Sequence, residues 1–374
     1  MKIGFDAKRA FLNQSGLGNY ARSLVSSLSE NFRSDEYALF TTRVPDISFT
    51  NAMRSKTNVS IENPTSFIDR KLRARWRSYG ITDLLISRKI QLYHGLSNEL
   101  PFNIQKFSGR KVVTVHDLIF LRHPGLYPFL DRSIYNRKCR HSCHVADVIV
   151  AVSEQTKRDL EELYFLPESR IRVIYQGSDP SFYEDPGAGK KAEVRTRYKL
   201  PAEYILHVGT IEDRKNLITV VKALEDVKDI ALVVIGKKKG HFSAVDDLLT
   251  KKKMRNRVFF FEDVPLEDLP AIYRQAKAFA YPSLIEGFGI PIIEALASRV
   301  PVITSKGGCF PEAGGPGTIY IDPEDPEELA DKLKEILSSE SLSETMRSTG
   351  ETYVKKFHPS VIAAQMHELY RSLY

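Results

Sequence analysis

Short apolar stretches alternate with amphipathic stretches along the whole chain, and this alternation restricts the possible folds more than any other feature. The predicted strands are apolar throughout, as expected of parallel strands that helices cover on both faces. The pattern therefore predicts an α/β protein with doubly wound parallel sheets. The predicted strands are Lys2–Asp6, Tyr37–Thr41, Leu92–His94, Lys111–Val115, Val148–Val152, Arg172–Tyr175, Tyr204–Val208, Ala231–Ile235, Val258–Phe261, Ala278–Tyr281, Val302–Thr304 and Thr318–Ile321.

The strand pattern also predicts where the chain divides. With 374 residues, the chain is longer than one average domain. The strand series stops between Ser178 and Lys199, where prolines and glycines are mixed with charged residues as in a linker. We therefore predict Rossmann-like domains over residues 1–180 and 181–358, whose sheets share one cleft, and a final helix within residues 359–374. Ligands of such sheets bind beyond the carboxyl ends of the strands.

Composition narrows the class of protein. A hydrophobic content of 42% and a charged content of 27% are those of a soluble globular protein. The N-terminal run lacks the apolar core of a signal peptide, and the apolar runs are of strand length. Three cysteines are too few for a disulfide framework in a chain of this size. We therefore expect a cytoplasmic protein.

Positive charge is concentrated in one segment. The net charge of +7 allows nucleic acid, an anionic membrane or phosphorylated ligands as partners. The segment Arg70–Arg77 is rich in arginine and lysine, and Leu72, Trp76 and Tyr79 follow one another at helical spacing. One interpretation is a helix on the cytoplasmic face of an anionic membrane, with its apolar side down. The other is a solvated basic face over a buried Leu/Trp seam.

Two carboxylates eight positions apart, Glu286 and Glu294, follow the predicted strand Ala278–Tyr281. Pro291 suits the first turn of a helix, so Glu294 is expected in that turn, with Glu286 in the loop before it. The helix amides attract anions, and a carboxylate accepts hydrogen bonds from sugar hydroxyls. This arrangement predicts a nucleotide-sugar site; the alternative is an ordinary strand–loop–helix with two solvated glutamates. The loop that would bring backbone amides close to the ligand contains Gly287, Phe288 and Gly289.

Two adjacent cations, Arg214 and Lys215, follow the predicted strand Tyr204–Val208. We expect them opposite the Glu286–Glu294 loop, where they would neutralise a departing diphosphate. Fixed cations stabilise a transition state in which negative charge grows on the leaving group. Arg214 can bind in a bidentate manner, whereas Lys215 provides a compact point charge.

His116 follows the strand Lys111–Val115 at its carboxyl end, where it could bind a sugar hydroxyl or polarise a reacting group. The alternative is a histidine bonded to neighbouring backbone. Gly16 and Gly18, together with Ala21, match the dinucleotide fingerprint G-x-G-x-x-A. The distance from the first strand and the lack of a ribose-binding acid after the second strand favour a phosphate-binding glycine loop instead.

A metal site is not expected. Cys139, His141, Cys143 and His144 are close in sequence, but they fall in a predicted helix on which His141 points away from the two cysteines. A second ligand pair at zinc spacing is missing, and so is an Asp-x-Asp pair for magnesium. We therefore expect no cofactor, with cationic side chains and helix dipoles binding the diphosphate.

Taken together, these motifs resemble the retaining GT-B glycosyltransferases of family 4, also called glycosyl transferases group 1. The resemblance spans the chain and implies two Rossmann-like domains, with the donor held mostly by the second domain and the acceptor mostly by the first. It also implies that the final helix packs back onto the first domain. The matching motifs are Gly16-x-Gly18-x-Tyr20, His116-Asp117, Gly209 with Arg214-Lys215-Asn216, and Pro282-Ser283-x-x-Glu286-Gly287-Phe288-Gly289 leading to Glu294 and Pro301-Val302.

The resemblance also assigns roles by position. Glu286 matches the carboxylate that meets donor-sugar hydroxyls and Glu294 the one that meets the ribose, while Arg214 and Lys215 match the diphosphate-binding cations. Gly16 and Gly18 match the phosphate loop of the first domain, and His116 matches the sugar-contacting histidine. The chain departs from many relatives at Thr210, where they have arginine, and at Arg299, where they have a small residue.

The resemblance therefore predicts a retaining hexosyltransferase of cell-surface polysaccharide biosynthesis. GDP-mannose is the first expected donor, because the Arg-Lys-Asn run is similar to that of a mannosyltransferase subgroup, and UDP-hexoses follow. The expected acceptor is a saccharide or a lipid-linked saccharide, and nucleic acid is not an expected partner. Two alternatives stay open: a catalytically silent subunit that binds nucleotide-sugars, and an NAD(P)-dependent oxidoreductase.

Overall fold

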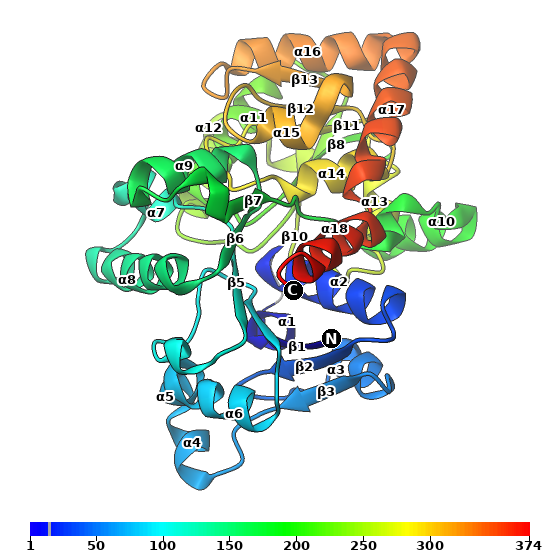
Figure 1. The fold of residues 1–374 in the computed structure, drawn as a ribbon. Helices are drawn as coiled ribbons and strands as arrows, with labels where there is room; N and C mark the ends of the chain where they lie inside the picture. The colour runs from blue at the N-terminus through cyan, green and yellow to red at the C-terminus, as the bar shows by residue number, and fades with distance from the viewer. Residues whose placement is uncertain (14–15) are drawn as a thin grey trace. The chain divides into compact units, whose positions relative to one another are not determined.

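The computed structural model describes residues 1–13 and 16–374. The chain forms two compact units: unit 1 contains residues 1–177 and 359–374, and unit 2 contains residues 178–358. Each unit has one parallel sheet with helices on both of its faces (Figure 1). Within the described ranges, no helix combines the length and hydropathy needed to cross a bilayer.

Unit 1 has a seven-stranded sheet in the order β3-β2-β1-β4-β5-β6-β7. All its strand pairs are parallel, as predicted from the uniformly apolar strands. The strands are β1 (Lys2–Asp6), β2 (Glu36–Phe40), β3 (Val59–Glu62), β4 (Leu92–Gly95), β5 (Arg110–Val115), β6 (Val148–Ala151) and β7 (Ile171–Val173).

The helices of unit 1 are α1 (Lys8–Leu12), α2 (Gly16–Asn31), α3 (Ser48–Arg54), α4 (Phe67–Lys71), α5 (Arg73–Arg75), α6 (Ile81–Ser87), α7 (Ile119–Arg122), α8 (Phe129–Val145), α9 (Glu154–Tyr164) and α18 (Pro359–Arg371). Short 3-10 or π turns lie between them: η1 (Trp76–Gly80), η2 (Ile104–Lys106), η3 (Pro124–Leu126) and η4 (Glu168–Arg170).

Unit 2 has a six-stranded parallel sheet in the order β10-β9-β8-β11-β12-β13. Its strands are β8 (Tyr204–Val208), β9 (Ala231–Ile235), β10 (Val258–Phe261), β11 (Ala278–Tyr281), β12 (Val302–Ser305) and β13 (Thr318–Ile321). Its helical segments are η5 (Pro180–Tyr183), α10 (Gly187–Tyr198), η6 (Asp213–Lys215), α11 (Leu217–Ala223), α12 (Phe242–Lys251), η7 (Arg255–Arg257), α13 (Leu269–Tyr273), α14 (Ile290–Ala297), α15 (Phe310–Gly314), η8 (Gly315–Gly317), α16 (Pro326–Ser338), α17 (Glu340–Val354) and η9 (Lys355–Phe357).

Successive side chains of a strand point to opposite faces, which explains why these strands are apolar throughout. In β2, Tyr37 and Leu39 join the core beneath α2 and α18. Ala38 and Phe40, between and after them, join a second core on the other face of the sheet. The predicted α/β fold with doubly wound parallel sheets is confirmed, because both faces of each strand must be apolar to bury two layers of helices.

Both sheets contain a point at which the direction of chain progression reverses. In unit 2 the chain moves outward from β8 to β9 and β10, and then returns to place β11 beside β8. The same reversal occurs between β1 and β4 in unit 1. Loops on the two sides of such a switch point diverge and leave a crevice at the carboxyl ends of the strands, where ligands of α/β sheets bind.

Strand β3 was missed in the sequence, and the reason is its position. Its sequence, Val-Ser-Ile-Glu, is half polar, and its residues are only partly buried or exposed. β3 is the outermost strand, so it pairs only with β2 and one of its edges lies open. An edge strand needs no uniformly apolar side chains and therefore lacks the signal that identified the central strands.

The basic segment Arg70–Arg77 does not form one membrane-facing helix. It is divided among α4, α5 and the π-helical turn η1. Trp76 is only 4% exposed and belongs to a core of unit 1, so its predicted place on an outward apolar face is wrong. Arg77 is also internal, where it pairs with Asp6 and, at 2.5 Å, with Glu99. Leu72 remains exposed, so the alternative of a buried Leu/Trp seam holds only for the tryptophan.

Candidate functional site

The candidate site of unit 2 lies at its topological switch point. The cations Arg214 and Lys215 belong to η6, just after β8, and Glu286 lies in the loop after the neighbouring strand β11. The backbone N–H of Leu284 donates to the Arg214 carbonyl oxygen at 2.7 Å, which ties the two loops together. The pairing of β8 with β11 thus brings together residues that are about 70 positions apart in sequence.

Both cations contact the same carboxylate. Lys215 Nζ donates to Glu286 Oε1 and to the Tyr281 hydroxyl. Arg214 Nη1 donates to Glu286 Oε2 at 2.8 Å. The structure therefore places the predicted residues Arg214 and Lys215 in direct contact with Glu286. It also adds Tyr281 to the site, because this residue ends β11 beside the loop that contains Glu286.

The two oxygens of Glu286 differ in how fully they are occupied. Besides the Lys215 ammonium, Oε1 accepts from the Tyr281 hydroxyl at 2.9 Å and from Ser283 Oγ at 2.8 Å. Within residues 1–13 and 16–374, Arg214 is the protein donor on Oε2. A carboxylate has about four acceptor positions, so Oε2 can accept one further hydrogen bond, such as that of a sugar hydroxyl.

The electrostatics keep Glu286 ionised. Burial alone would raise the pKa of Glu286, but the charges of Lys215 and Arg214 outweigh burial and bring this pKa to about 2. Burial lowers the pKa of Lys215, although the negative charge of Glu286 acts to raise it. The result is a mostly buried cluster of ion pairs.

Arg214 has a second acidic partner at the rim of the site. Its Nη2 lies 2.7 Å from Glu212 Oε1, and the two side chains are 24% and 28% exposed. By contrast, the side chains of Lys215 and Glu286 are each 10% exposed. Because a partly hydrated ion pair is weaker than a buried one, an incoming anion can displace Glu212 more easily than Glu286.

Glu294 lies deeper in α14 than expected. It is the fifth residue of this helix, which begins at Ile290, so the prediction that it occupies the first turn is wrong. The Tyr273 hydroxyl donates to Glu294 Oε2 at 2.9 Å. Burial raises the pKa of Glu294 to about 8, although the bond from Tyr273 acts in the opposite direction. At neutral pH, Glu294 is therefore mostly protonated, in contrast to Glu286.

The loop before α14 is held from within unit 2. Phe288 is buried and packs edge-on against Phe357, with ring centroids 5.4 Å apart. Cys309 Sγ donates to the carbonyl oxygens of Glu286 and Phe288 at 3.2 and 3.0 Å. Gly289 has φ of 124°, a conformation that side chains disfavour, and it directly precedes the first residue of α14. Phe288 thus anchors the loop, and the glycine allows the sharp entry into the helix.

His116 is buried in unit 1, and both of its ring nitrogens are engaged. Nε2 lies 2.8 Å from the Leu96 carbonyl oxygen, which can only accept, so Nε2 carries the proton. Nδ1 therefore accepts from Gln176 Nε2 at 2.8 Å. Burial lowers the pKa of His116 to about 4, even though the bond to Leu96 raises it, and the ring is neutral at pH 7. Gln176 is a partner that the sequence did not indicate, because it lies 60 positions away.

Gly16 and Gly18 lie in the first turn of α2 rather than in a loop before it. A Cβ atom on Gly18 would lie 1.9 Å from the Asn13 carbonyl oxygen, so only glycine fits this contact. The intervening α1 also separates β1 from α2, unlike the tight strand-to-helix turn of a dinucleotide fingerprint.

The cysteine and histidine side chains of α8 are not grouped as the ligands of one metal ion. Cys139 and Cys143 are buried on the inner face of the helix. Over the ranges that the structure describes, no three His, Cys, Asp or Glu residues are grouped to hold a metal ion.

Two family models together match most of the chain. Residues 14–182 match the model described as Glycosyltransferase Family 4, and residues 191–353 match the model described as Glycosyl transferases group 1. The chain is 27% identical to O-antigen chain mannosyltransferase B of Escherichia coli over 100% of both chains. It is also 27% identical to O-antigen chain mannosyltransferase RfbU of Salmonella typhimurium over 60% of each chain.

Solved structures show the same fold at lower sequence identity. Anabaena Alr3699/HepE in complex with UDP and glucose superposes with a TM-score of 0.78 at 17% identity, covering 100% of both chains. WaaG, described as a glycosyltransferase involved in lipopolysaccharide biosynthesis, superposes with a TM-score of 0.73 at 16% identity, covering 99% of each chain.

Proposed function

Because the chain belongs to the GT-B glycosyltransferases of family 4, we propose that it transfers a hexosyl unit from a nucleoside-diphosphate sugar to a saccharide or lipid-linked saccharide. We favour mannose as the sugar, GDP-mannose as the donor and retention of configuration at the anomeric carbon. The process that it serves is cell-surface polysaccharide biosynthesis. The observation that supports this proposal most directly is the Arg214–Lys215–Glu286 cluster at the switch point of unit 2.

The choice of donor rests on relatives and on one short motif. Full-length similarity to an O-antigen chain mannosyltransferase, together with the run Arg214-Lys215-Asn216, favours GDP-mannose. A UDP-hexose is the second choice, since a structure with the same fold contains UDP and glucose.

The chemistry of the cluster suits departure of a diphosphate. When the bond between the anomeric carbon and the phosphate oxygen breaks, negative charge grows on the diphosphate. Arg214 and Lys215 are already oriented by Glu286, so stabilising this charge requires little reorganisation. Glu286 is held by both cations, which favours its use as a hydrogen-bond acceptor for the donor sugar over its use as a nucleophile.

If Glu286 is a hydrogen-bond acceptor and not a nucleophile, the acceptor hydroxyl must attack the anomeric carbon from the face that the diphosphate leaves, because only this attack retains the configuration. The departing phosphate oxygen can accept the proton of the acceptor hydroxyl as the new glycosidic bond forms. His116, which is neutral and hydrogen-bonded at both ring nitrogens, would then hold Leu96 and Gln176 in place rather than transfer a proton. The proposal requires no metal and no cofactor, and it places the enzyme in the cytoplasm, where nucleotide-sugars are made.

A transfer assay with substituted cations tests the proposal. Lys215→Ala and Glu286→Ala should each lower kcat for mannosyl transfer from GDP-mannose by about a hundredfold or more. Lys215 stabilises the leaving diphosphate in this proposal, and Glu286 orients the two cations and accepts from the donor sugar. Lys222→Ala, which changes an exposed lysine in α11, is the matched control and should retain full activity. Near-normal rates in both site variants would contradict the proposal, and NMR of the product would show which anomer forms.

A further inference from the structure

We propose that the switch point of unit 1 binds a phosphate group of the acceptor through Lys8, Arg9 and Ser97. These three residues are called the acceptor-phosphate site. The inference rests on the proposed function and deepens it, because it names the class of acceptor: a saccharide that carries a phosphate or a diphosphate. A phosphate of the donor would instead be bound by Arg214 and Lys215 in unit 2.

The acceptor-phosphate site follows the two strands that meet at the switch point. β1 ends at Asp6, and Lys8 and Arg9 begin α1 shortly after it. β4 ends at Gly95, and Ser97 lies in the segment that follows. β1 and β4 pair in parallel, so the segments after both strands leave the same edge of the sheet. Ligands of α/β sheets bind beyond this edge.

Lys8 and Arg9 are partly buried cations that have no acidic partner. Across residues 1–13 and 16–374, neither side chain lies within ion-pair distance of a carboxylate. Burial lowers the pKa of Lys8, and the charges of Arg77 and Arg9 lower it further. The carboxylates of Asp6 and Glu99 act in the opposite direction, but both already pair with Arg77. An external anion beside Lys8 and Arg9 would relieve the repulsion among these cations.

A buried hydroxyl provides a second, independent indication of a ligand. Ser97 is 7% exposed, and in the part of the chain that the structure describes its Oγ has no hydrogen-bond partner. A buried hydroxyl without a partner costs free energy, and in proteins such a group commonly meets a bound ligand, ion or water. Besides burial, the charge of Arg9 lowers the pKa of His116, which places Arg9 near the end of β5, the strand beside β4. The site therefore extends across the ends of three neighbouring strands.

The three side chains suit a phosphate better than a carboxylate. The Arg9 guanidinium, the Lys8 ammonium and the Ser97 hydroxyl are all hydrogen-bond donors, and they come from two segments of the chain. A carboxylate is planar and has two oxygens, whereas a phosphate ester directs three acceptor oxygens outward and can accept from each group. An arginine in addition forms bidentate pairs with phosphate. A phosphate ester or a diphosphate is therefore the expected ligand.

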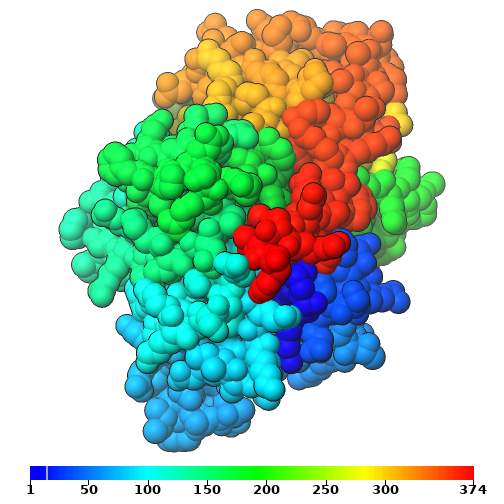
Figure 2. Space-filling model, in the orientation of Figure 1, coloured from blue at the N-terminus to red at the C-terminus, as the bar shows by residue number. Residues whose placement is uncertain are grey.

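The anion approaches this site at the strand ends. Helices α2 and α18 cover one face of the sheet, where their side chains join those of β1 in one core. Figure 2 shows the red surface of α18 against the blue surface of the N-terminal residues. Because that face is covered, the carboxyl edge of the sheet is the side from which a phosphate reaches Lys8 and Arg9.

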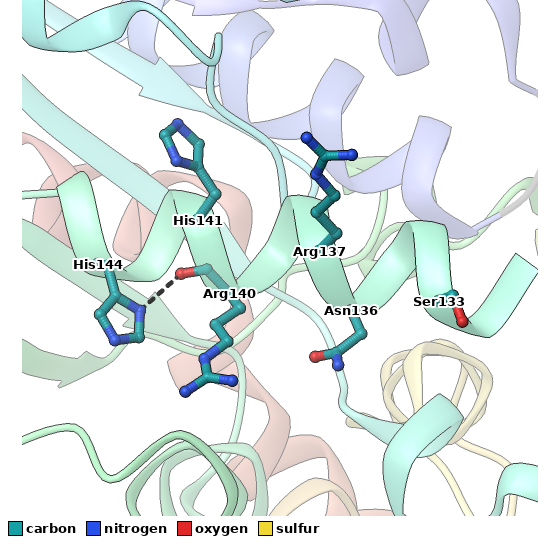
Figure 3. A pocket seen from close by; sticks show the side chains of 6 residues that line it. All are labelled: Ser133, Asn136, Arg137, Arg140, His141 and His144. Carbon is teal, nitrogen blue, oxygen red and sulfur yellow. Dashed lines mark hydrogen bonds between the residues drawn. The ribbon is translucent and has the colours of Figure 1, made fainter.

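The cations of α8, which line a pocket on that helix, are arranged differently. Figure 3 shows Arg137 and Arg140 pointing to opposite sides of the helix. Arg137 lies 5.6 Å over the Phe102 ring, and His144 Nδ1 donates to the Arg140 carbonyl oxygen at 2.8 Å, drawn as a dashed line in Figure 3. The two guanidinium groups do not converge on one anion, so Arg140 provides a control for the acceptor-phosphate site.

A titration of the full chain with inorganic diphosphate tests the proposal. With GDP present at saturation to fill unit 2, the wild type should bind one further diphosphate, measured by isothermal titration calorimetry. The double variant Lys8→Gln with Arg9→Gln should bind it about tenfold or more weakly, because two charged donors are lost. Ser97→Ala should weaken this binding by about three- to tenfold, because one uncharged donor is lost.

Matched variants separate a binding site from a general effect of charge. Arg54→Gln and Arg140→Gln remove exposed cations elsewhere in unit 1, and both should bind diphosphate as the wild type does. The variant Lys8→Arg with Arg9→Lys keeps both charges and should bind within about threefold of the wild type. A folding defect would weaken binding in this variant as well, so its recovery would show that charge is the cause.

Two further ligands identify the source of the phosphate. Mannose 1-phosphate presents a phosphate on the saccharide itself, whereas farnesyl diphosphate presents the diphosphate of a lipid-linked acceptor. The ligand that binds more tightly in the presence of GDP, and that loses affinity in the double variant, identifies which of the two the site takes.

Three outcomes would overturn the proposal. These are no further diphosphate binding at saturating GDP, unchanged diphosphate binding by the double variant, or a loss of GDP affinity in the double variant as large as its loss of diphosphate affinity. The last result would assign Lys8 and Arg9 to the donor. If GDP did not bind at all, the proposed function would fail, whereas the titration with diphosphate alone would still report on the two cations.

Discussion

Two carboxylates hold the Arg214 guanidinium from different sides, and they differ in accessibility. Glu286 is the buried partner, and Glu212 is the partly exposed one. Under the proposed function, a phosphate oxygen of the donor would compete with Glu212 for the Arg214 guanidinium. The negative charge of Glu212 would oppose the binding of that anion.

The first prediction follows from this competition. Glu212→Gln should bind GDP or UDP about two- to fivefold more tightly than wild type, since removing a partly exposed competing charge is worth roughly 0.5–1 kcal/mol. Isothermal titration calorimetry measures the change. Glu267→Gln, at an exposed acid of unit 2, provides the control for net charge. Weaker binding by Glu212→Gln would show that Glu212 orients Arg214 for the donor instead.

The second prediction concerns the protonation of Glu294. With a pKa of about 8, Glu294 is mostly neutral at pH 7. Ribose hydroxyls are donors, and they favour the ionised carboxylate, so nucleotide binding should release part of a proton at pH 7 and affinity should rise as pH increases toward 8. Titrations in buffers of different ionisation enthalpy measure the released proton. Glu294→Gln should abolish the release, and an unchanged release in this variant would place the proton on another group.

Helix α18 illustrates how one element completes a core that lies far away in sequence. It contacts α2, and its buried Ile362, Met366 and Tyr370 join residues of β1 and β2 in one core of unit 1. Tyr370 also reaches the centre of the sheet, where its hydroxyl bonds His94 Nδ1 at 2.6 Å. The other ring nitrogen of His94 bonds Thr114 Oγ1 at 2.8 Å, so α18 completes a buried polar network.

The third prediction tests this anchoring. Met366→Ala should lower the free energy of unfolding of unit 1 by about 2–5 kcal/mol, because it leaves a cavity. Tyr370→Phe should lower it by about 1–3 kcal/mol, because a buried imidazole nitrogen loses its partner. Gln365→Ala, at an exposed position of the same helix, should change it by less than about 0.5 kcal/mol. Chemical denaturation measures all three, and equal stability of Tyr370→Phe and wild type would contradict the anchoring role.

At the scale of the whole molecule, the two units have separate hydrophobic cores. The cores of unit 1 cover the two faces of its seven-stranded sheet, and the core of unit 2 lies against its six-stranded sheet. Chains built from separate cores often unfold in more than one step. The charged cluster of Arg214, Lys215 and Glu286 lies within unit 2, so a nucleotide should stabilise that unit more than the other.

The fourth prediction follows from the separate cores. Calorimetry should resolve two unfolding transitions, and GDP or UDP should raise the midpoint temperature of the unit 2 transition. At a nucleotide concentration a hundred times the dissociation constant, the free energy of unfolding of unit 2 should increase by about 2.7 kcal/mol. The variant Tyr370→Phe identifies the unit 1 transition independently, since it should lower the midpoint temperature of that transition alone. If nucleotide raised both transitions equally, the two units would have to unfold together or share the ligand.

The sequence by itself determined the α/β class, because uniformly apolar strands and amphipathic helices leave a local periodic signal. It also identified the Arg214, Lys215 and Glu286 positions, because they follow strands whose carboxyl ends bind ligands. The catalytic roles of these residues remain predictions. Their contact within one cluster required the pairing of β8 with β11.

Only the tertiary structure decided which charged and aromatic residues lie inside. One interpretation of the sequence placed Trp76 on an outward face, and both interpretations placed Arg77 there. The partners of Arg77, Asp6 and Glu99, are 71 and 22 positions away. The bond from Gln176 to His116 likewise spans 60 positions. Local patterns report which face of an element is apolar, whereas burial of a charge depends on partners that only the folded chain brings close enough to offset the cost of removing it from water.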